Sequence, residues 1–188
     1  MTEHNQQDHL LALVTSAQAG DEAAFESLYE EFYEPILRYI SFRVPTRDDA
    51  EDLAQQVFIR FYKNLANWTD QGYSPLAYIF TIARSVIADY WRSNKNRPIE
   101  ASEAILPFLV DTSPRPEEQA YSKQKIQEIL SAISRLPANY QEVVSLRLVS
   151  GLSNTEISKI ISKSNPATRK LYSRGIQKLQ LEINKDRE

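Results

Sequence analysis

Basic side chains are concentrated near the end of the chain, in a segment whose apolar residues recur at helical spacing. The cations are Arg169, Lys170, Arg174 and Lys178, and the apolar residues are Tyr172, Ile176, Leu179 and Ile183. Lysine and arginine contact the phosphates of nucleic acid, and arginine also pairs with base edges. The segment therefore predicts a helix with one buried face and one cationic face suited to a polyanion. The alternative is a basic face that is only solvated.

A capping motif before this helix starts a shorter one. Ser153 and Glu156 stand three residues apart, so the hydroxyl and the carboxylate can each satisfy a backbone N–H that the helix leaves open. Gly151 is of the type that commonly ends a helix, and Ser164 is placed to cap the basic helix. Two short helices joined by a polar turn, the second one basic, are the layout of a helix-turn-helix, whose second helix enters the major groove. A plain helical hairpin is the alternative.

Charge is distributed unevenly along the 188 residues. The net charge of −3 combines a net −7 over residues 1–92, a net −2 over residues 93–120 and a net +6 over residues 121–188. An acidic body attached to a basic end indicates a polyanion at one end and a different partner at the other. A chance imbalance explains the same numbers, so charge alone does not decide between the two interpretations.

The elements of the N-terminal half follow from apolar residues at helical spacing. Leu10 and Val14 mark a first short helix, and Asp21 opens a longer one. Thr46 is expected to cap a third helix, and Pro75 to stand in the first turn of a fourth, where proline is tolerated. A loop at 67–73 joins these last two helices. With only four glycines and no strand-like alternation, the sequence predicts an all-α fold.

A proline-rich stretch separates the two halves. Residues 93–118 contain four prolines and several charges, which is typical of a flexible linker. We therefore predict two small helical domains, at 1–95 and 118–188, joined by a linker at 96–117. Residues 104–110 are unusually apolar for a free tether. They either pack on the chain's own domains or thread a partner's groove, and the sequence does not separate these possibilities.

Motifs in both halves resemble the extracytoplasmic-function sigma factors, the smallest members of the sigma-70 family. Residues 136–147, followed by Gly151-Leu152-Ser153 and Glu156-Ile157, look like the family's promoter −35 binding domain. Residues 49–58 look like its core-polymerase-binding helix, and residues 75–84 look like its −10 element region. Each fragment is weakly specific, whereas three in order around a proline-rich linker are a strong resemblance. It implies a promoter-specific transcription initiation factor that binds RNA polymerase core and promoter DNA, and it makes an anti-sigma partner possible.

The resemblance also assigns roles to residues. It implies contacts with the largest polymerase subunit at Asp49, Glu51, Asp52, Gln55 and Gln56, and it implies −10 DNA contacts at Asn67, Trp68, Tyr73, Arg84 and Arg92. Aromatic faces suit the second task because they stack on unpaired bases. Without the motif, the carboxylates read as helix-dipole and solubility residues, and several aromatics read as core.

In the C-terminal half, the resemblance implies −35 contacts at Arg147, Ser164, Arg169, Lys170, Ser173 and Arg174. The chain departs from the family here. Ser162 and Pro166 stand where glycine is usual, and Leu171 replaces a common arginine. The −35 sequence preference is therefore the least predictable property of the chain.

Two other classes of protein are less consistent with the sequence. A conventional helix-turn-helix regulator predicts a dimer and a palindromic site, but no dimer seam is evident. An enzyme would need a constellation that is not visible, since His4 and His9 lie near the terminus without metal-ligand spacing. We expect no cofactor and no metal. The absence of cysteine, of a signal peptide and of a long apolar run predicts a cytoplasmic protein that does not insert into a membrane.

Overall fold

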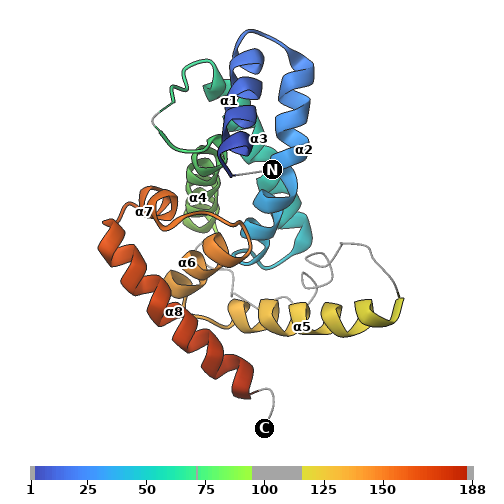
Figure 1. The fold of residues 1–188 in the computed structure, drawn as a ribbon, viewed down its shortest axis with the longest axis vertical. Helices are drawn as coiled ribbons and strands as arrows, with labels where there is room; N and C mark the ends of the chain where they lie inside the picture. Colours follow the sequence, from blue (N-terminus) through green and yellow to red (C-terminus); the bar gives the residue numbers. More distant parts are fainter. Residues whose placement is uncertain (1–2, 71, 95–115, 186–188) are drawn as a thin grey trace.

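The computed structural model describes residues 3–70, 72–94 and 116–185, and within these ranges every regular element is a helix. The elements are α1 (Glu3–Gln18), α2 (Glu22–Ser41), α3 (Arg47–Leu65), α4 (Pro75–Ser93), α5 (Pro116–Ser134), α6 (Ala138–Leu148), α7 (Asn154–Ile160) and α8 (Asn165–Lys185) (Figure 1). The predicted all-α fold is confirmed. The apolar stretch at 104–110 lies outside the described residues.

Side-chain caps start the helices of the N-terminal half where the sequence predicts them. The Asp21 carboxylate accepts from the backbone N–H of Ala23 at 3.0 Å, and Thr46 Oγ1 accepts from the N–H of Asp49 at 3.1 Å. Ser74 caps α4 in the same way, directly before Pro75. These caps fix where the helices begin, and the cap at Ser74 thereby fixes the end of the loop that joins α3 to α4.

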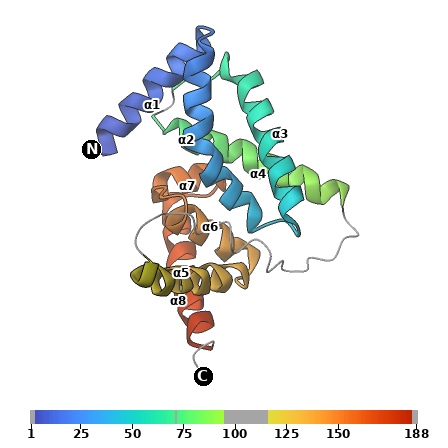
Figure 2. The ribbon, with the colours of Figure 1, turned by 90° about the vertical axis from the view of Figure 1, so that its right-hand side faces the viewer.

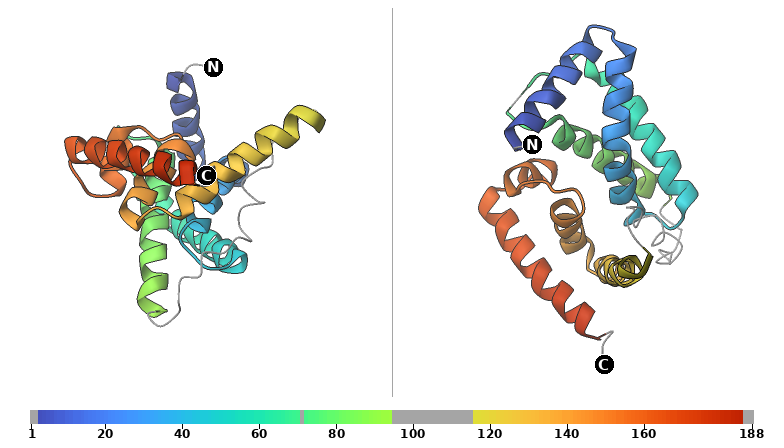
Figure 3. Two further views of the ribbon diagram at one scale, coloured as in Figure 1. Left: turned by 90° about the horizontal axis from the view of Figure 1, so that it is seen from below. Right: turned by 45° about the vertical axis from the view of Figure 1, so that its right-hand side comes forward.

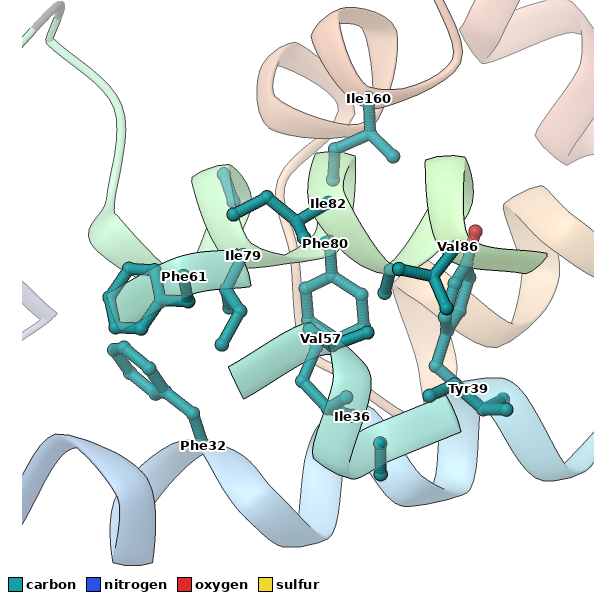
Figure 4. Close-up of a cluster of buried hydrophobic side chains, with 14 of the residues drawn as sticks. Phe32, Ile36, Tyr39, Val57, Phe61, Ile79, Phe80, Ile82, Val86 and Ile160 are labelled. Atoms are coloured by element: carbon teal, nitrogen blue, oxygen red, sulfur yellow. The ribbon is translucent and has the colours of Figure 1, made fainter. Parts of the chain in front are cut away.

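One apolar core holds α2, α3 and α4 together. Phe32 and Ile36 of α2, Phe61 of α3, and Ile79 and Phe80 of α4 are almost completely removed from solvent. Figure 4 shows these side chains converging from the three helices. Burial of this many large side chains supplies the main stabilisation of the half, and it makes α3 and α4 a rigid support for the groups on their outer faces.

The C-terminal half contains the predicted helix-turn-helix, formed by α7 and α8. Ser153 accepts from the N–H of Glu156 and the Glu156 carboxylate accepts from the N–H of Ser153, so the predicted capping box is present. Gly151 has a φ of +70°, which glycine adopts without strain, but it follows the end of α6 by three residues instead of capping it directly. The chain therefore turns at Gly151 before α7 begins.

Gly175 allows α6 and α8 to approach closely. A Cβ atom at this position would lie 2.7 Å from Cγ2 of Val144, a fully buried residue. Valine is stiff about χ1, so the methyl group cannot rotate away freely. Glycine at this position therefore lowers the helix propensity of α8 but allows α6 and α8 to pack closely.

Substitution of Gly175 by alanine is expected to lower the free energy of unfolding of the chain by about 1–3 kcal/mol, because overpacking outweighs the usual gain from alanine in a helix. The double variant Gly175→Ala/Val144→Ala removes the clashing methyl group and should differ little from Val144→Ala alone. Urea unfolding followed by circular dichroism measures both effects. A stabilised single variant would contradict the packing role.

The two halves of the molecule pack directly against each other. Helix α7 lies against α4, as Figures 1 and 2 both show, and the right-hand view in Figure 3 again shows the orange α7 next to the green α4. Ile160 of α7 points toward Ile82 of α4 (Figure 4), and both side chains belong to one continuous buried cluster. The sequence predicts the two helical groups but not this contact between them.

Candidate nucleic-acid interface

The outer face of α3 carries the residues that the sequence assigns to polymerase binding. Asp52, Gln55 and Gln56 are exposed, whereas Asp49 and Glu51 are half-buried. Asp49 accepts from the Thr46 hydroxyl at 2.6 Å, and Glu51 pairs with Arg47. The last two carboxylates therefore also stabilise the start of α3 and its first turns, and the freely presented part of the face is Asp52, Gln55 and Gln56.

This face continues along α3 into apolar residues that the sequence analysis missed. Ile59 is 53% exposed and Tyr62 is 60% exposed, and they follow Gln55 at helical spacing. The Tyr62 ring lies edge-on to Phe25 of α2 at 4.9 Å. Large apolar side chains left in solvent at the end of a polar stripe are typical of a protein-binding surface. Their helical register with Gln55 is the signal that could have identified them.

A cavity of about 310 Å³ lies at the loop between α3 and α4. Asn67, Trp68 and Tyr73, the three loop residues assigned to −10 DNA, line it together. Tyr78 of α4 adds a second aromatic wall, with its ring centroid 6.3 Å from that of Trp68. A partly enclosed space lined by aromatic rings offers faces on which an unpaired base can stack.

Helix α1 holds this loop in place through Gln18, a residue to which the sequence pattern assigns no role. Gln18 donates from Nε2 to the carbonyl oxygens of Leu65 and Trp68, at 2.8 Å each. The amide thus ties the end of α3 to the aromatic wall of the cavity. No local motif marks Gln18, because its partners lie 47 and 50 residues away in the chain.

The two arginines assigned to −10 DNA, Arg84 and Arg92, are both exposed on α4 and lie about two helical turns apart. Arg92 donates to Asp89 at 2.9 Å, and Asp89 also accepts from Arg60 of α3 at 2.8 Å. The hydrogen bond from Arg60 holds the pKa of the Asp89 carboxyl below its usual value, with both arginine charges adding to the effect. Arg84 pairs with Glu142 of α6 at 3.0 Å. The structure therefore places one of these cations against the other half of the molecule.

The residues assigned to −35 DNA lie on α8 and around its start. Arg169, Lys170, Ser173 and Arg174 are exposed and repeat at intervals of four residues, so they share one face. Thr168, Gly175 and Leu179 are buried on the opposite side. Ser164 Oγ accepts from the N–H of Ala167 at 3.4 Å, which fits its predicted capping position. The basic helix thus presents its cations outward, as reading of a groove requires.

Arg147 joins this surface from α6. It donates to the carbonyl oxygen of Leu152 at 2.8 Å and lines an open hollow together with Arg169. Three polar residues that were not predicted from the sequence line the same hollow: Asn154, Thr155 and Asn165. Asn165 donates to the Thr155 hydroxyl at 3.0 Å, which links the starts of α7 and α8. The spacing of these residues around the turn is the signal that could have found them.

The Glu156 carboxylate forms hydrogen bonds with both halves of the molecule. Its carboxylate closes the capping box of α7 and also accepts from the Ser74 hydroxyl, the cap of α4. Burial on its own raises the pKa of the Glu156 carboxyl, but the hydrogen bonds from Ser74 and Ser153 outweigh it and hold the pKa below its usual value. The charged form is therefore the stabilising one.

A pH dependence follows from Glu156. Because its pKa is lowered in the folded chain, its contribution is fully present above the ordinary carboxyl pKa and disappears as the pH falls through the lowered value. We expect Glu156→Gln to lower the free energy of unfolding by about 1 kcal/mol at pH 7. The difference from the parent chain should shrink as the pH falls from about 5 to about 3. Urea titrations at several pH values measure it, and a difference that stays constant with pH would contradict the assignment.

The chain matches two family models in the order of its two halves. Residues 28–97 match sigma-70 region 2, and residues 126–179 match sigma-70 region 4. The chain is 32% identical over 170 residues to the ECF RNA polymerase sigma factor BldN of Streptomyces coelicolor, covering 90% of this chain and 64% of that protein. It is 32% identical over 155 residues to the RNA polymerase sigma factor SigZ of Bacillus subtilis, covering 82% of this chain and 84% of that protein. The chain therefore belongs to the sigma-70 family and, within it, to the ECF sigma factors.

Solved structures agree at the level of the fold. CnrH, determined in complex with the cytosolic domain of CnrY, has a TM-score of 0.67 at 20% identity and covers 95% of this chain and 99% of its own. The sigma factor RpoE of Bartonella quintana, determined with the anti-sigma factor NepR, has a TM-score of 0.62 at 22% identity over 85% and 98% of the two chains. Sigma factors are transcription initiation factors and are not known as catalysts. No helix in the described parts of the chain has the length and apolar content to cross a bilayer.

Proposed function

We propose that this sigma factor divides promoter recognition between its two halves. Residues 1–95 form a domain that binds RNA polymerase core and melts and reads the −10 element. Residues 118–188 form a domain that reads the −35 element, and residues 96–117 link the two. The polymerase performs the chemistry, and the factor supplies the promoter sequence preference.

The observation that carries this proposal is the presence of three different surfaces on one chain. The exposed face of α3 is acidic and polar, with an apolar end. The cavity beside α4 is aromatic, and the outer face of α8 is cationic. A helix-turn-helix regulator would need only the third surface. A protein surface combined with sites for single-stranded and double-stranded DNA supports a factor that joins a polymerase to a promoter.

The aromatic cavity supports strand separation as the task of the N-terminal half. An unpaired base that enters the cavity exchanges stacking in the duplex for stacking on the aromatic rings that line it. Arg92 is exposed on α4, the helix that also carries Tyr78, and its cation can contact the phosphates of the captured strand. The tie from Gln18 keeps the cavity formed before DNA arrives, which lowers the entropic cost of capture.

The cationic face of α8 supports duplex reading as the task of the C-terminal half. Arg169 and Lys170 lie in its first two turns, the part of a recognition helix that meets base edges. Arg174 lies one turn further on, where phosphate contact is expected. Base-edge contacts carry sequence preference, and phosphate contacts carry affinity.

In vitro transcription with core polymerase on a promoter library tests the proposal. We expect the parent chain to direct initiation from promoters that share a −10 and a −35 element. The variant Arg169→Ala should relax the preference at −35 positions and leave the −10 preference unchanged. The exposed Gln180→Ala on the same helix serves as the control. Specific high-affinity binding of DNA by the free chain, without any effect on transcription by core, would overturn the proposal.

An anti-sigma partner and a cytoplasmic location complete the proposal. Two similar solved structures are complexes of sigma factors, one with the cytosolic domain of CnrY and one with the anti-sigma factor NepR. They support an inhibitor protein that binds this chain. The cytoplasm is where core polymerase and promoter DNA meet.

A further inference from the structure

The C-terminal half lies on the surface that the proposed function assigns to −10 DNA. Three groups of that surface are engaged from across the interface. Arg84 is paired with Glu142 of α6, and Ser74, beside the cavity, donates to Glu156 of α7. The ammonium group of Lys159 lies 4.9 Å from the centre of the Tyr73 ring and lines the cavity. The interface therefore covers the start and the middle of α4.

Glu142 is the polar centre of this interface. Its carboxylate accepts from Arg84 at 3.0 Å and from the Tyr39 hydroxyl at 3.2 Å. Burial raises the pKa of Tyr39, so its hydroxyl stays a proton donor across the physiological range. Two donors from the N-terminal half thus converge on one anion of the C-terminal half. A carboxylate in this position offers Arg84 the same charge-assisted hydrogen bond that a DNA phosphate would offer.

A second polar contact and an apolar contact extend the interface. Arg43, which stacks on the Tyr39 ring at 3.8 Å, donates to the Ser145 hydroxyl at 2.9 Å. Ile82 of α4 and Ile160 of α7 are 8% and 3% exposed. Apolar burial stabilises the interface, and the ion pair and the hydrogen bonds fix the orientation of the two halves relative to each other.

The interface leaves the proposed polymerase face accessible. Asp52, Gln55 and Gln56 are exposed, and so are the apolar Ile59 and Tyr62 further along α3. In this conformation the N-terminal half can therefore bind polymerase while its −10 surface is covered.

We propose that the free chain is closed on itself and that the C-terminal domain is a built-in inhibitor of −10 binding, with Glu142 standing in for a DNA phosphate at Arg84. This inference rests on the proposed function for Arg84 and the loop cavity. In the closed chain, the DNA phosphate must displace Glu142, and a base can enter the cavity only after Lys159 moves. Docking of α3 on core, followed by separation of the halves, makes the −10 surface available.

Domain separation is measured directly by energy transfer between two dyes. The chain contains no cysteine, so the exposed Asn64 of α3 and Gln180 of α8 can be replaced by cysteine and labelled. We expect Glu142→Arg to lower the transfer efficiency, because it places a cation against Arg84. The affinity of the free chain for a single-stranded −10 oligonucleotide should rise about fivefold. Added salt should also lower the transfer in the parent chain, since it screens the pair.

Two further variants keep the test decisive. Glu128→Arg makes the same charge change on α5, which packs on α6 and α8, and it should leave the transfer high. Arg84→Glu opposes two carboxylates and should open the chain without touching the C-terminal half. The double variant Arg84→Glu/Glu142→Arg restores an ion pair with the charges exchanged, so it should restore the high transfer efficiency. If Glu142→Arg alone fails to fold, the comparison of Arg84→Glu with this double variant tests the closed state.

The outcomes separate closure from function, because the transfer measurement uses neither DNA nor polymerase. Unchanged transfer in both single variants overturns the closed state. Lower transfer without a gain in oligonucleotide affinity overturns the inhibitory role of the interface. Lower transfer with the gain, in a chain that nevertheless fails to direct core to promoters, supports the inhibitor and contradicts the proposed function alone.

Discussion

Substitution of Trp68 by alanine is expected to reduce the stability of the open promoter complex by about 5- to 150-fold. Stacking of one base on an aromatic side chain contributes about 1–3 kcal/mol, and Trp68 forms a wall of the loop cavity. Binding of duplex promoter DNA at the −35 element should be unaffected, because α8 carries that surface. Permanganate footprinting of the holoenzyme on a fixed promoter measures the loss.

The second tryptophan of the chain provides a matched control. Trp91 lies on α4, and its indole N–H donates to the carbonyl oxygen of Arg43 at 2.9 Å. The variant Trp91→Phe keeps an aromatic ring at this position and loses the hydrogen bond, so it should lower stability slightly and leave open-complex formation intact. Equal losses in the two variants would mean that Trp68 acts through the fold and not through a base.

Reversal of charge on the outer face of α3 is expected to weaken binding of core polymerase by about 100-fold. A partner surface that complements the acidic, polar face of α3 is basic. The double variant Asp52→Lys/Gln56→Lys places two cations opposite such a surface, and like charges across an interface cost several kcal/mol. Both side chains are exposed, so the fold should tolerate the change. Surface plasmon resonance with immobilised core measures the affinity.

Two other variants show whether the loss is specific. Glu128→Lys changes the charge of the other half of the molecule and should leave core affinity within twofold. Tyr62→Ala removes an exposed apolar side chain at the end of the same face and should weaken binding about tenfold if that face docks as a unit. Normal core binding by the double variant would exclude α3 as the docking element.

Local chemistry explains what could be predicted from the sequence. The caps at Asp21, Thr46, Ser74 and Ser153 each act within three residues of themselves, so their partners are visible in the sequence. Apolar spacing likewise gives the helices and the buried side of α8. The resemblance to a family added the assignment of surfaces, which rests on motifs and not on geometry.

Contacts between distant segments could not be predicted. Glu142 reads as an ordinary helical residue, but its partners Tyr39 and Arg84 lie 103 and 58 residues before it. Glu156 was expected only as part of a capping box, and its bond to Ser74 spans 82 residues. Ile59 and Tyr62 were missed for a different reason, because apolar periodicity predicts burial and does not indicate which apolar residues remain in solvent.

The bond between Gln18 and the loop has a consequence for how the N-terminal domain is delimited. The match to sigma-70 region 2 begins at residue 28, so α1 lies entirely before it. Even so, the single side-chain amide of Gln18 connects α1 to Leu65 and Trp68. A truncated protein cut at the family boundary would keep every residue assigned to DNA and lose the brace that shapes their binding cavity. The smallest working unit of this domain is therefore larger than its recognisable sequence.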